Sequence, residues 1–244
     1  MRIVFVLLVV LSITSCTNYG LGNFSNETTL LHKPSYRGDS ISKSNYISAS
    51  FNKSFHNDNY DEYSSILIGD AQFHRALTKK YMNFAYGGFL YYGNYNAFDY
   101  KTIKGGNLSF YGVGATTEIN FNIPTERFDI RLIGAKMTLF TENGGYSKFK
   151  DAIQDFQVSE DDYLYSGADV NSSDVGMSIA ATSELVYKGR NYDAGCSLVL
   201  SFGSSIVSAG SKLFYSQNGV TVFLKSNHSI YGTYRGLGLS YRLK

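Results

Sequence analysis

The stretch that decides the fold is Asn107-Leu-Ser-Phe-Tyr-Gly-Val-Gly-Ala-Thr-Thr-Glu-Ile-Asn-Phe-Asn-Ile123. From residue 111 onward its odd positions are apolar except for Thr117, and its even positions are small or polar and include Glu118. This alternation with a period of two predicts a strand with one apolar and one polar face. The polar face is rich in glycine and carries a single charge, which is unusual for a strand that faces bulk water.

Aromatic residues close both ends of the apolar face of this strand. Tyr111 and Phe121 lie ten positions apart, and Tyr192 and Phe202 bracket another run in the same way. At about 3.3 Å per residue and a tilt of about 40°, this interval spans about 25 Å, the height of the apolar band of an outer-membrane barrel. The spacing therefore predicts strands that cross a membrane.

The composition favours β structure in one domain. The chain has 244 residues, of which 43% are hydrophobic, 16% aromatic and only 17% charged, with 24 Gly and 2 Pro. Such a chain is neither disordered nor a coiled coil. Its net charge of +2 is too balanced for a nucleic-acid partner, and no basic cluster with interleaved aromatic residues occurs. We therefore expect no nucleic-acid binding.

Ten runs of the sequence are predicted to be strands. The predicted strands are 45–54, 63–75, 81–93, 107–122, 127–140, 175–187, 192–202, 211–216, 219–226 and 230–243. Their connections alternate between short and longer, as in barrels with short turns at one end, and Asn218-Gly219 is a strong hairpin signal. The short connection 227–229 breaks this rhythm, so eight and ten strands both remain open. The fold prediction is all-β: a single antiparallel up-and-down β-barrel of 8–10 strands, with one short helix in a long loop.

The long connection 141–174 contains the predicted helix. Four apolar residues follow Ser147, a candidate N-cap, at helical spacing. They are Phe149, Ala152, Ile153 and Phe156. This helix is predicted to act as a lid or plug over one mouth of the barrel.

Two positions disturb the alternation of apolar residues. The apolar parity changes between Leu132 and Ile133, which predicts a bulge near Gly134. Arg235 falls on the apolar face of the last strand, where an arginine in the middle of a membrane costs about 2–4 kcal/mol. A bulge at Gly236 would turn Arg235 inward; without such a bulge, Arg235 counts against strands that cross a membrane.

The N-terminus has a basic start and an apolar run too short to span a membrane, followed by Ile13-Thr-Ser-Cys16. It resembles a bacterial lipoprotein signal peptide, and these four residues match the lipobox. The resemblance implies that residues 1–15 are removed and that Cys16 is acylated, with palmitate among its fatty acids. Residues 16–44 are polar without a sustained period, so we interpret them as a lipid-anchored tether to a barrel domain over 45–244. Cys196 then has no disulfide partner and serves as a small hydrophobe.

The C-terminal Gly236-Leu-Gly-Leu-Ser-Tyr-Arg-Leu-Lys244, together with the strand alternation, looks like a small outer-membrane β-barrel protein. The residue composition of Ser35–Asp39 and Tyr86–Tyr92 also resembles that of uncharacterised Bacteroidota lipoproteins with a barrel domain. The likeness covers most of the mature chain and implies no functional residues. The chain departs from many such barrels by ending in a lysine instead of an aromatic residue.

Glu118 and Glu184 both fall on small-residue faces and are the candidate lumen charges. Paired carboxylates can perform acid–base catalysis if their strands approach each other. We favour a structural role, because buried charges need partners and Arg131, Lys136 and Arg242 are available.

No other cluster carries a recognisable chemistry. His228-Ser229 are neighbours at a turn without a matching acidic motif, and the acidic residues between 160 and 174 match no calcium loop. We therefore predict no catalytic residues, no metal site and no cofactor, and the protein is not expected to be an enzyme.

The functional prediction is a lipid-anchored outer-membrane β-barrel protein with a structural, adhesive or loop-mediated interaction role. Its expected partner is outer-membrane lipid through acylated Cys16, and the sequence indicates no particular protein partner. The alternative is a water-soluble, lipid-tethered β-barrel that binds a lipid or another apolar ligand inside. In that case the cavity would be lined by Tyr111, Val113, Ile119 and Leu198. The two hypotheses differ in whether these residues point outward or inward.

Overall fold

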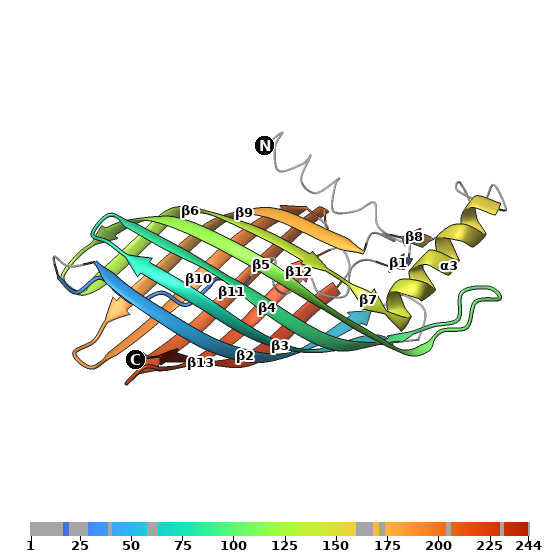
Figure 1. The fold of residues 1–244 in the computed structure, drawn as a ribbon, viewed down its shortest axis with the longest axis horizontal. Helices are drawn as coiled ribbons and strands as arrows, with labels where there is room; N and C mark the ends of the chain where they lie inside the picture. The colour runs from blue at the N-terminus through green and yellow to red at the C-terminus, as the bar shows by residue number, and fades with distance from the viewer. Residues whose placement is uncertain are drawn as a thin grey trace.

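A computed structural model shows that the chain folds into a closed β-barrel (Figure 1). The residues that it describes are 17–19, 29–38, 41–57, 63–159, 168–170, 174–203, 206–229 and 232–243. Within them, ten long strands make the barrel wall, each antiparallel to its neighbours in chain order. These strands are β2 (Ser42–Asn57), β3 (Tyr63–Thr78), β4 (Met82–Ala97), β5 (Gly106–Pro124), β6 (Phe128–Thr141), β9 (Val175–Lys188), β10 (Tyr192–Gly203), β11 (Ile206–Gln217), β12 (Val220–Ser229) and β13 (Gly232–Leu243). Pairing of β13 with β2 closes the barrel and confirms the predicted fold with ten strands.

The two ends of the barrel differ in their connections. At one end, here called the turn end, the connections are 79–81, 125–127, 189–191 and 218–219, and β2 begins and β13 ends there. At the other end, the loop end, β2 and β3, β4 and β5, and β6 and β9 are joined by longer segments. The connection expected over 203–210 is shorter than predicted, because β11 already begins at Ile206 and pairs with the end of β10. Barrel closure thus extends strands beyond their most periodic residues.

The remaining described elements gather at the loop end. The short strand β7 (Asn143–Gly144) pairs with β5, and it leads into α3 (Gly145–Ser159). The strand β1 (Thr17–Tyr19) pairs in parallel with β8 (Ala168–Val170), which lies in the same long connection (Figure 1). The helix confirms the prediction for this segment, but the expected N-cap is wrong: α3 begins at Gly145, so Ser147 lies in its first turn. No helix in the described part of the chain is long and apolar enough to cross a membrane.

The apolar face of every barrel strand points outward. Tyr111 is 53% exposed, Val113 61% and Leu198 63%, and Ile119 lies on the same outward face of β5. The alternative arrangement, in which these residues line an internal cavity, is therefore wrong. One exposed apolar residue from each strand illustrates the belt: Phe51, Phe73, Leu90, Val113, Leu139, Ile179, Leu198, Leu213, Leu224 and Leu239.

Charged side chains on the outer face of the described strands stay near the strand ends. Lys43 and Arg75 lie near the turn end, and Lys53 and Arg235 lie near the loop end, each within four residues of a strand terminus. No bulge occurs at Gly236: the pairing of β13 with β2 runs without interruption through Arg235, which stands opposite Lys53. Arg235 is accommodated by its position at the edge of the belt, where a long side chain can reach water.

A β-bulge in β6 keeps its apolar residues outside. The register with β9 shifts between Arg131 and Gly134, and both intervening residues, Leu132 and Ile133, are exposed. This confirms the predicted bulge. Gly134 then lies under a buried hydrogen bond in which Asn120 Nδ2 donates to Thr182 Oγ1 at 2.7 Å.

We predict that Gly134→Val destabilises the barrel. A Cβ at this position would lie 2.0 Å from Asn120 Nδ2 and 2.6 Å from the backbone oxygen of Ile119, and such overpacking costs about 1–3 kcal/mol. The matched control is Gly69→Val, because Gly69 faces outward and a Cβ there meets nothing within 4 Å. Urea unfolding in detergent, followed by circular dichroism, should show a lower midpoint for the first variant only. Equal midpoints would contradict this packing.

Candidate functional site: the filled barrel interior

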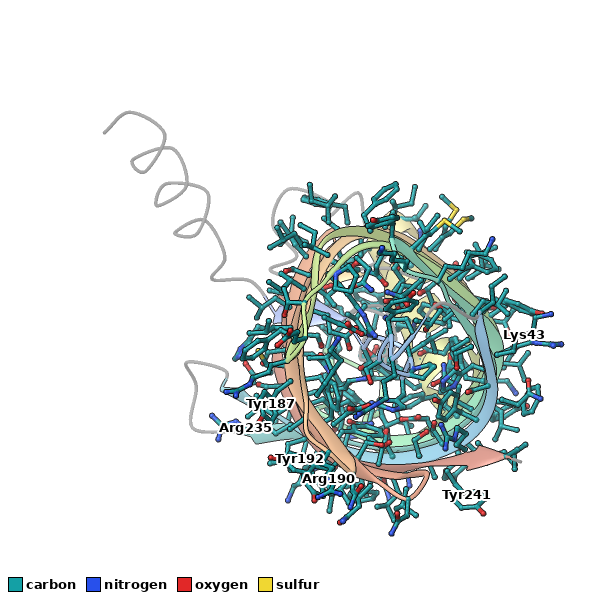
Figure 2. The ribbon with its side chains drawn as sticks, turned by 90° about the vertical axis from the view of Figure 1, so that its left-hand side faces the viewer. Lys43, Tyr187, Arg190, Tyr192, Arg235 and Tyr241 are labelled. Atoms are coloured by element: carbon teal, nitrogen blue, oxygen red, sulfur yellow. The ribbon has the colours of Figure 1, made fainter. Side chains whose placement is uncertain are left out.

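Residues 29–37 lie inside the barrel, in the half near the turn end, and are called here the inner segment. Leu30 to Ser35 are buried, and Leu31 and Lys33 are each 1% exposed. These residues belong to the stretch that the sequence analysis interpreted as a tether, which was predicted to lie outside the barrel domain. Figure 2 looks along the barrel from the turn end and shows side chains filling its interior.

The central feature of the interior is a cluster of ion pairs around Lys33. The ammonium group of Lys33 pairs with Glu118 of β5 and lies 3.4 Å from Glu184 of β9. Arg131 of β6 pairs with the same oxygen of Glu184, and all four side chains are fully buried. The inner segment thus supplies a cation to two carboxylates of the barrel wall, which satisfies charges that would otherwise be buried alone.

The predicted lumen charges are therefore both inside the barrel, held in ion pairs. Of the partners considered, Arg131 contacts Glu184, whereas Lys136 directs its ammonium group to the carbonyl of Thr29 at 2.8 Å. Arg242 is exposed at the turn end, away from this cluster. Lys33 was not considered, because its polar surroundings in the sequence indicated a linker. The two carboxylates and the two cations therefore form a network of buried ion pairs.

The backbone of the inner segment is held by side chains of the wall. Its carbonyl groups at Leu30 and Pro34 accept hydrogen bonds from Lys212 at 2.7 Å and from Arg131 at 2.9 Å. Its amide group at Leu31 donates to Glu118 at 3.1 Å. A buried segment outside any sheet needs such partners, because an unpaired backbone group costs free energy. The wall of the barrel is therefore built around this segment.

Aromatic rings fix the middle of the inner segment. The imidazole of His32 packs edge-on against Tyr46 and Phe214, with ring centroids 5.2 and 5.4 Å apart. His74 of β3 stacks on Tyr46 and shares a hydrogen bond of 2.9 Å with the carbonyl oxygen of His32. These contacts come from three strands and hold the inner segment in a single position.

Closer to the turn end, the inner segment is held by acidic residues. The amide of Tyr36 donates to Asp129 at 2.5 Å, and Ser35 donates to Asp193 at 2.8 Å. Arg37 pairs with the same Asp193 as the segment leaves the barrel. The inner segment therefore runs from mid-barrel at Thr29 to the turn end at Arg37.

The loop end is closed by α3 and its aromatic contacts. Tyr146 of α3 stacks on Tyr95 with centroids 4.5 Å apart, and Lys150 forms a buried ion pair with Glu142 at 2.9 Å. Further residues of the same buried cluster are Phe89, Tyr91, Phe110, Phe140, Phe149, Ile153 and Tyr234. The predicted role of the helix as a plug agrees with this packing.

The interior contains a further ion pair, in which the ammonium group of Lys225 of β12 lies 3.4 Å from the carboxylate of Asp70 of β3.

His228 and Cys196 lie away from the interior ion pairs, on the outer face of the barrel. His228 Nδ1 lies 2.9 Å from Thr233 Oγ1 and its Nε2 lies 3.3 Å from Ser226 Oγ, and Cys196 is exposed on the apolar face. No group of three or more His, Cys, Asp or Glu side chains is placed to hold a metal among the described residues. Cys16 and most of the acidic stretch between 160 and 174 lie outside the described residues.

The sequence matches no protein-family model, and comparison with curated proteins finds no match. Several solved structures of outer-membrane barrel proteins are similar in fold. The beta domain of the Bordetella autotransporter Brka shares 9% identity at a TM-score of 0.43, and the match covers 84% of this chain and 100% of that one. Ail of Yersinia pestis shares 11% at 0.33, with 84% and 100% covered, and a mutant of the TodX monoaromatic hydrocarbon channel shares 13% at 0.36, with 94% and 73% covered. Likenesses this weak assign no activity to the chain.

We predict that Lys33→Met destabilises the protein strongly, because it leaves Glu118 and Glu184 with one cation fewer. Removal of one partner of a buried pair costs about 3–5 kcal/mol. The double variant Lys33→Met/Glu118→Gln should recover part of this loss, since it also removes the carboxylate. Unfolding midpoints in detergent for the wild type, both single variants and the double variant give the coupling free energy.

The matched control is an exposed ion pair at the loop end. Lys104 donates to Asp99 at 2.7 Å, and this hydrogen bond lowers the pKa of Asp99. Because exposed pairs contribute little to stability, Lys104→Met should leave the unfolding midpoint almost unchanged. A Lys33→Met midpoint equal to that of the control would contradict a structural role for the inner segment.

Proposed function

We propose that this protein is a closed β-barrel of the bacterial outer membrane, held there by its strands and by an acylated Cys16, with a structural or loop-mediated interaction role and no catalysis. The observation that supports this most directly is that the barrel is apolar outside and charged inside, the reverse of a soluble protein. Exposed apolar side chains cover the outer face of every barrel strand, whereas the interior holds ion pairs. A soluble monomer rarely exposes a contiguous apolar patch above a few hundred Å², so this exterior favours a lipid environment.

The aromatic residues near the ends of the belt support a membrane location. Near the turn end, Tyr187 packs against Phe128 and Tyr192, and Tyr192 stacks on Tyr215, with centroids 5.4 to 6.0 Å apart. Figure 2 shows Tyr187, Tyr192 and Tyr241 outside the ring of strands. Aromatic girdles at both interfaces are characteristic of outer-membrane barrels.

The filled interior favours a scaffold over an open channel. The inner segment occupies the half of the barrel near the turn end, and α3 with its aromatic cluster occupies the loop end. Barrels of this strand number leave an interior that side chains can largely fill. The surfaces left for interaction with a partner are the longer connections at the loop end, which in bacterial barrels face the cell exterior.

The position of β1 indicates on which side of the membrane the proposed lipid anchor lies. Cys16 precedes Thr17 in the sequence, and β1 pairs with β8 at the loop end. The described residues that follow, 29–37, lie inside the barrel and leave it at the turn end. We therefore propose that the acyl chains of Cys16 enter the leaflet on the loop-end side.

Membrane integration is tested by extraction of the Cys16→Ser protein from membranes. The variant should remain in the membrane pellet after alkaline carbonate, because its strands and not only its lipid hold it. Leu198→Arg places a charge midway along β10 and should reduce insertion, since an arginine at the bilayer midplane costs about 2–4 kcal/mol. Val220→Arg, at the turn-end start of β12, is the matched control with a cost of about 0–1 kcal/mol. Release of the Cys16→Ser protein without detergent would refute the membrane-barrel proposal.

The position of the anchor is tested by labelling in a Cys196→Ala background. Wild-type protein should incorporate radiolabelled palmitate, and Cys16→Ser should not. With an impermeant maleimide on intact cells, Asn18→Cys at the loop end should react, whereas Glu126→Cys at the turn end should react only after permeabilisation. The reverse labelling pattern would place the anchor on the other side of the membrane, and equal palmitate incorporation would refute acylation of Cys16.

A further inference from the structure

A cavity of about 310 Å³ opens at the turn end, where the inner segment leaves the barrel. Its wall combines that segment, the turn 189–191 and the end of β13. Three arginines, Arg37, Arg190 and Arg242, and one acidic residue, Asp193, line it, so its formal charge is 3 − 1 = +2. The cavity is large enough for a small ligand that carries an anionic group.

The single carboxylate of the cavity is already neutralised. Asp193 pairs with Arg37 and accepts a hydrogen bond from Ser35 at 2.8 Å. Arg190 and Arg242 have no carboxylate within 4.0 Å among the residues that the structure describes. Two guanidinium groups therefore remain available on one small cavity.

The positive charge continues beyond this cavity across the mouth of the barrel. A second cavity of about 240 Å³ shares Arg37, Asp193 and Arg242 with the first. A third, of about 570 Å³, shares Arg37 and Arg190 and adds Lys80, Lys188 and Glu126 to the wall. The lining residues of all three include five cations and two carboxylates; Lys188 is also paired with the buried Asp129 at 3.2 Å, so the formal charge with that partner included is 5 − 3 = +2.

We propose that the turn-end cavity binds a phosphate group, carried either by an anionic lipid headgroup or by a small soluble phosphate compound. Guanidinium groups bind phosphate through paired charge-assisted hydrogen bonds, and those of Arg190 and Arg242 line one cavity from separate elements. Tyr192 lies in the cavity wall and also stacks on Tyr215 on the outer face of the barrel. The cavity therefore adjoins the face that is proposed to contact lipid. In Figure 2, Arg190 and Tyr192 lie side by side at this rim. The lipid source rests on the proposed membrane location, whereas binding of soluble phosphate does not.

The test uses the full chain purified in a non-ionic detergent. Calorimetric titration with inorganic phosphate tests the soluble source, and nanodiscs of phosphatidylglycerol compared with phosphatidylcholine, read by native mass spectrometry, test the lipid source. The variant Arg190→Gln/Arg242→Gln should bind the favoured probe at least about tenfold more weakly, since each charged hydrogen bond is worth about that factor. The matched control is Lys43→Gln/Arg75→Gln, which removes the same charge from the outer face near the same end. Both variants should show the far-ultraviolet circular dichroism of the wild type.

The outcomes separate the alternatives. If the arginine variant binds inorganic phosphate more weakly than the wild type and the control does not, the result supports a soluble phosphate ligand. If this difference is seen with phosphatidylglycerol and not with inorganic phosphate, it supports a lipid headgroup. Binding that is absent for both probes, or equal in the arginine variant and the control, overturns the proposal. Phosphate binding in a protein that carbonate releases from membranes would preserve this site while the proposed membrane location failed.

Discussion

The contact of Lys33 with two carboxylates of the barrel wall is the interaction on which the interior depends. Glu118 and Glu184 come from β5 and β9, and of these two carboxylates Arg131 of the intervening β6 pairs only with Glu184. Buried carboxylates need cations, and the second cation comes from a segment outside the wall. The barrel strands alone are therefore an incomplete fold, and the inner segment is one of its structural elements.

This dependence explains why the two faces of the wall can differ so strongly. A strand that alternates with a period of two must place one set of side chains outside and the other inside. On β5 the outward set includes Val113 and Phe121, and the inward set includes Thr116, Glu118 and Asn120. Polar and charged residues such as Glu118 and Asn120 are tolerated inside because they have partners there: Glu118 pairs with Lys33 of the inner segment, and Asn120 donates a hydrogen bond to Thr182. The apolar outer face then needs a surrounding as apolar as itself.

The wall was predictable from the sequence because its signals are local. The alternation in β5, the hairpin signal at Asn218-Gly219 and the parity change at Leu132 and Ile133 each involve neighbouring residues, and each agrees with the structure. The inner segment was not predictable in this way. Its residues have no period, and Lys33 meets Glu118 across 85 positions of the chain, so a polar linker was the simpler interpretation.

The helix and the turn-end cavity show the same limit. Pairing of β7 with β5 makes α3 begin at Gly145, and this long-range contact overrides the local cap signal at Ser147. Arg242 was considered as a partner for the buried carboxylates from its inward parity alone, but its position next to the end of β13 places it at the mouth. The basic cavity was missed because Arg37, Arg190 and Arg242 come from three distant parts of the sequence. The parity of a residue in its strand indicates whether its side chain points inward or outward. Its distance from the barrel ends and the side chains that surround it depend on how the barrel closes.

The inner segment and the proposed lipid anchor belong to one piece of chain, and its length permits both roles. Tyr19 of β1 lies at the loop end, and Thr29 lies at the depth of Lys136 and Lys212. The ten steps between them, 29 − 19 = 10, reach at most about 35 Å. The apolar belt of a barrel is about 25 Å high, so half of it is spanned with chain to spare. A single polar stretch is therefore long enough to join the proposed anchor on the loop-end side to the ion pairs inside the barrel.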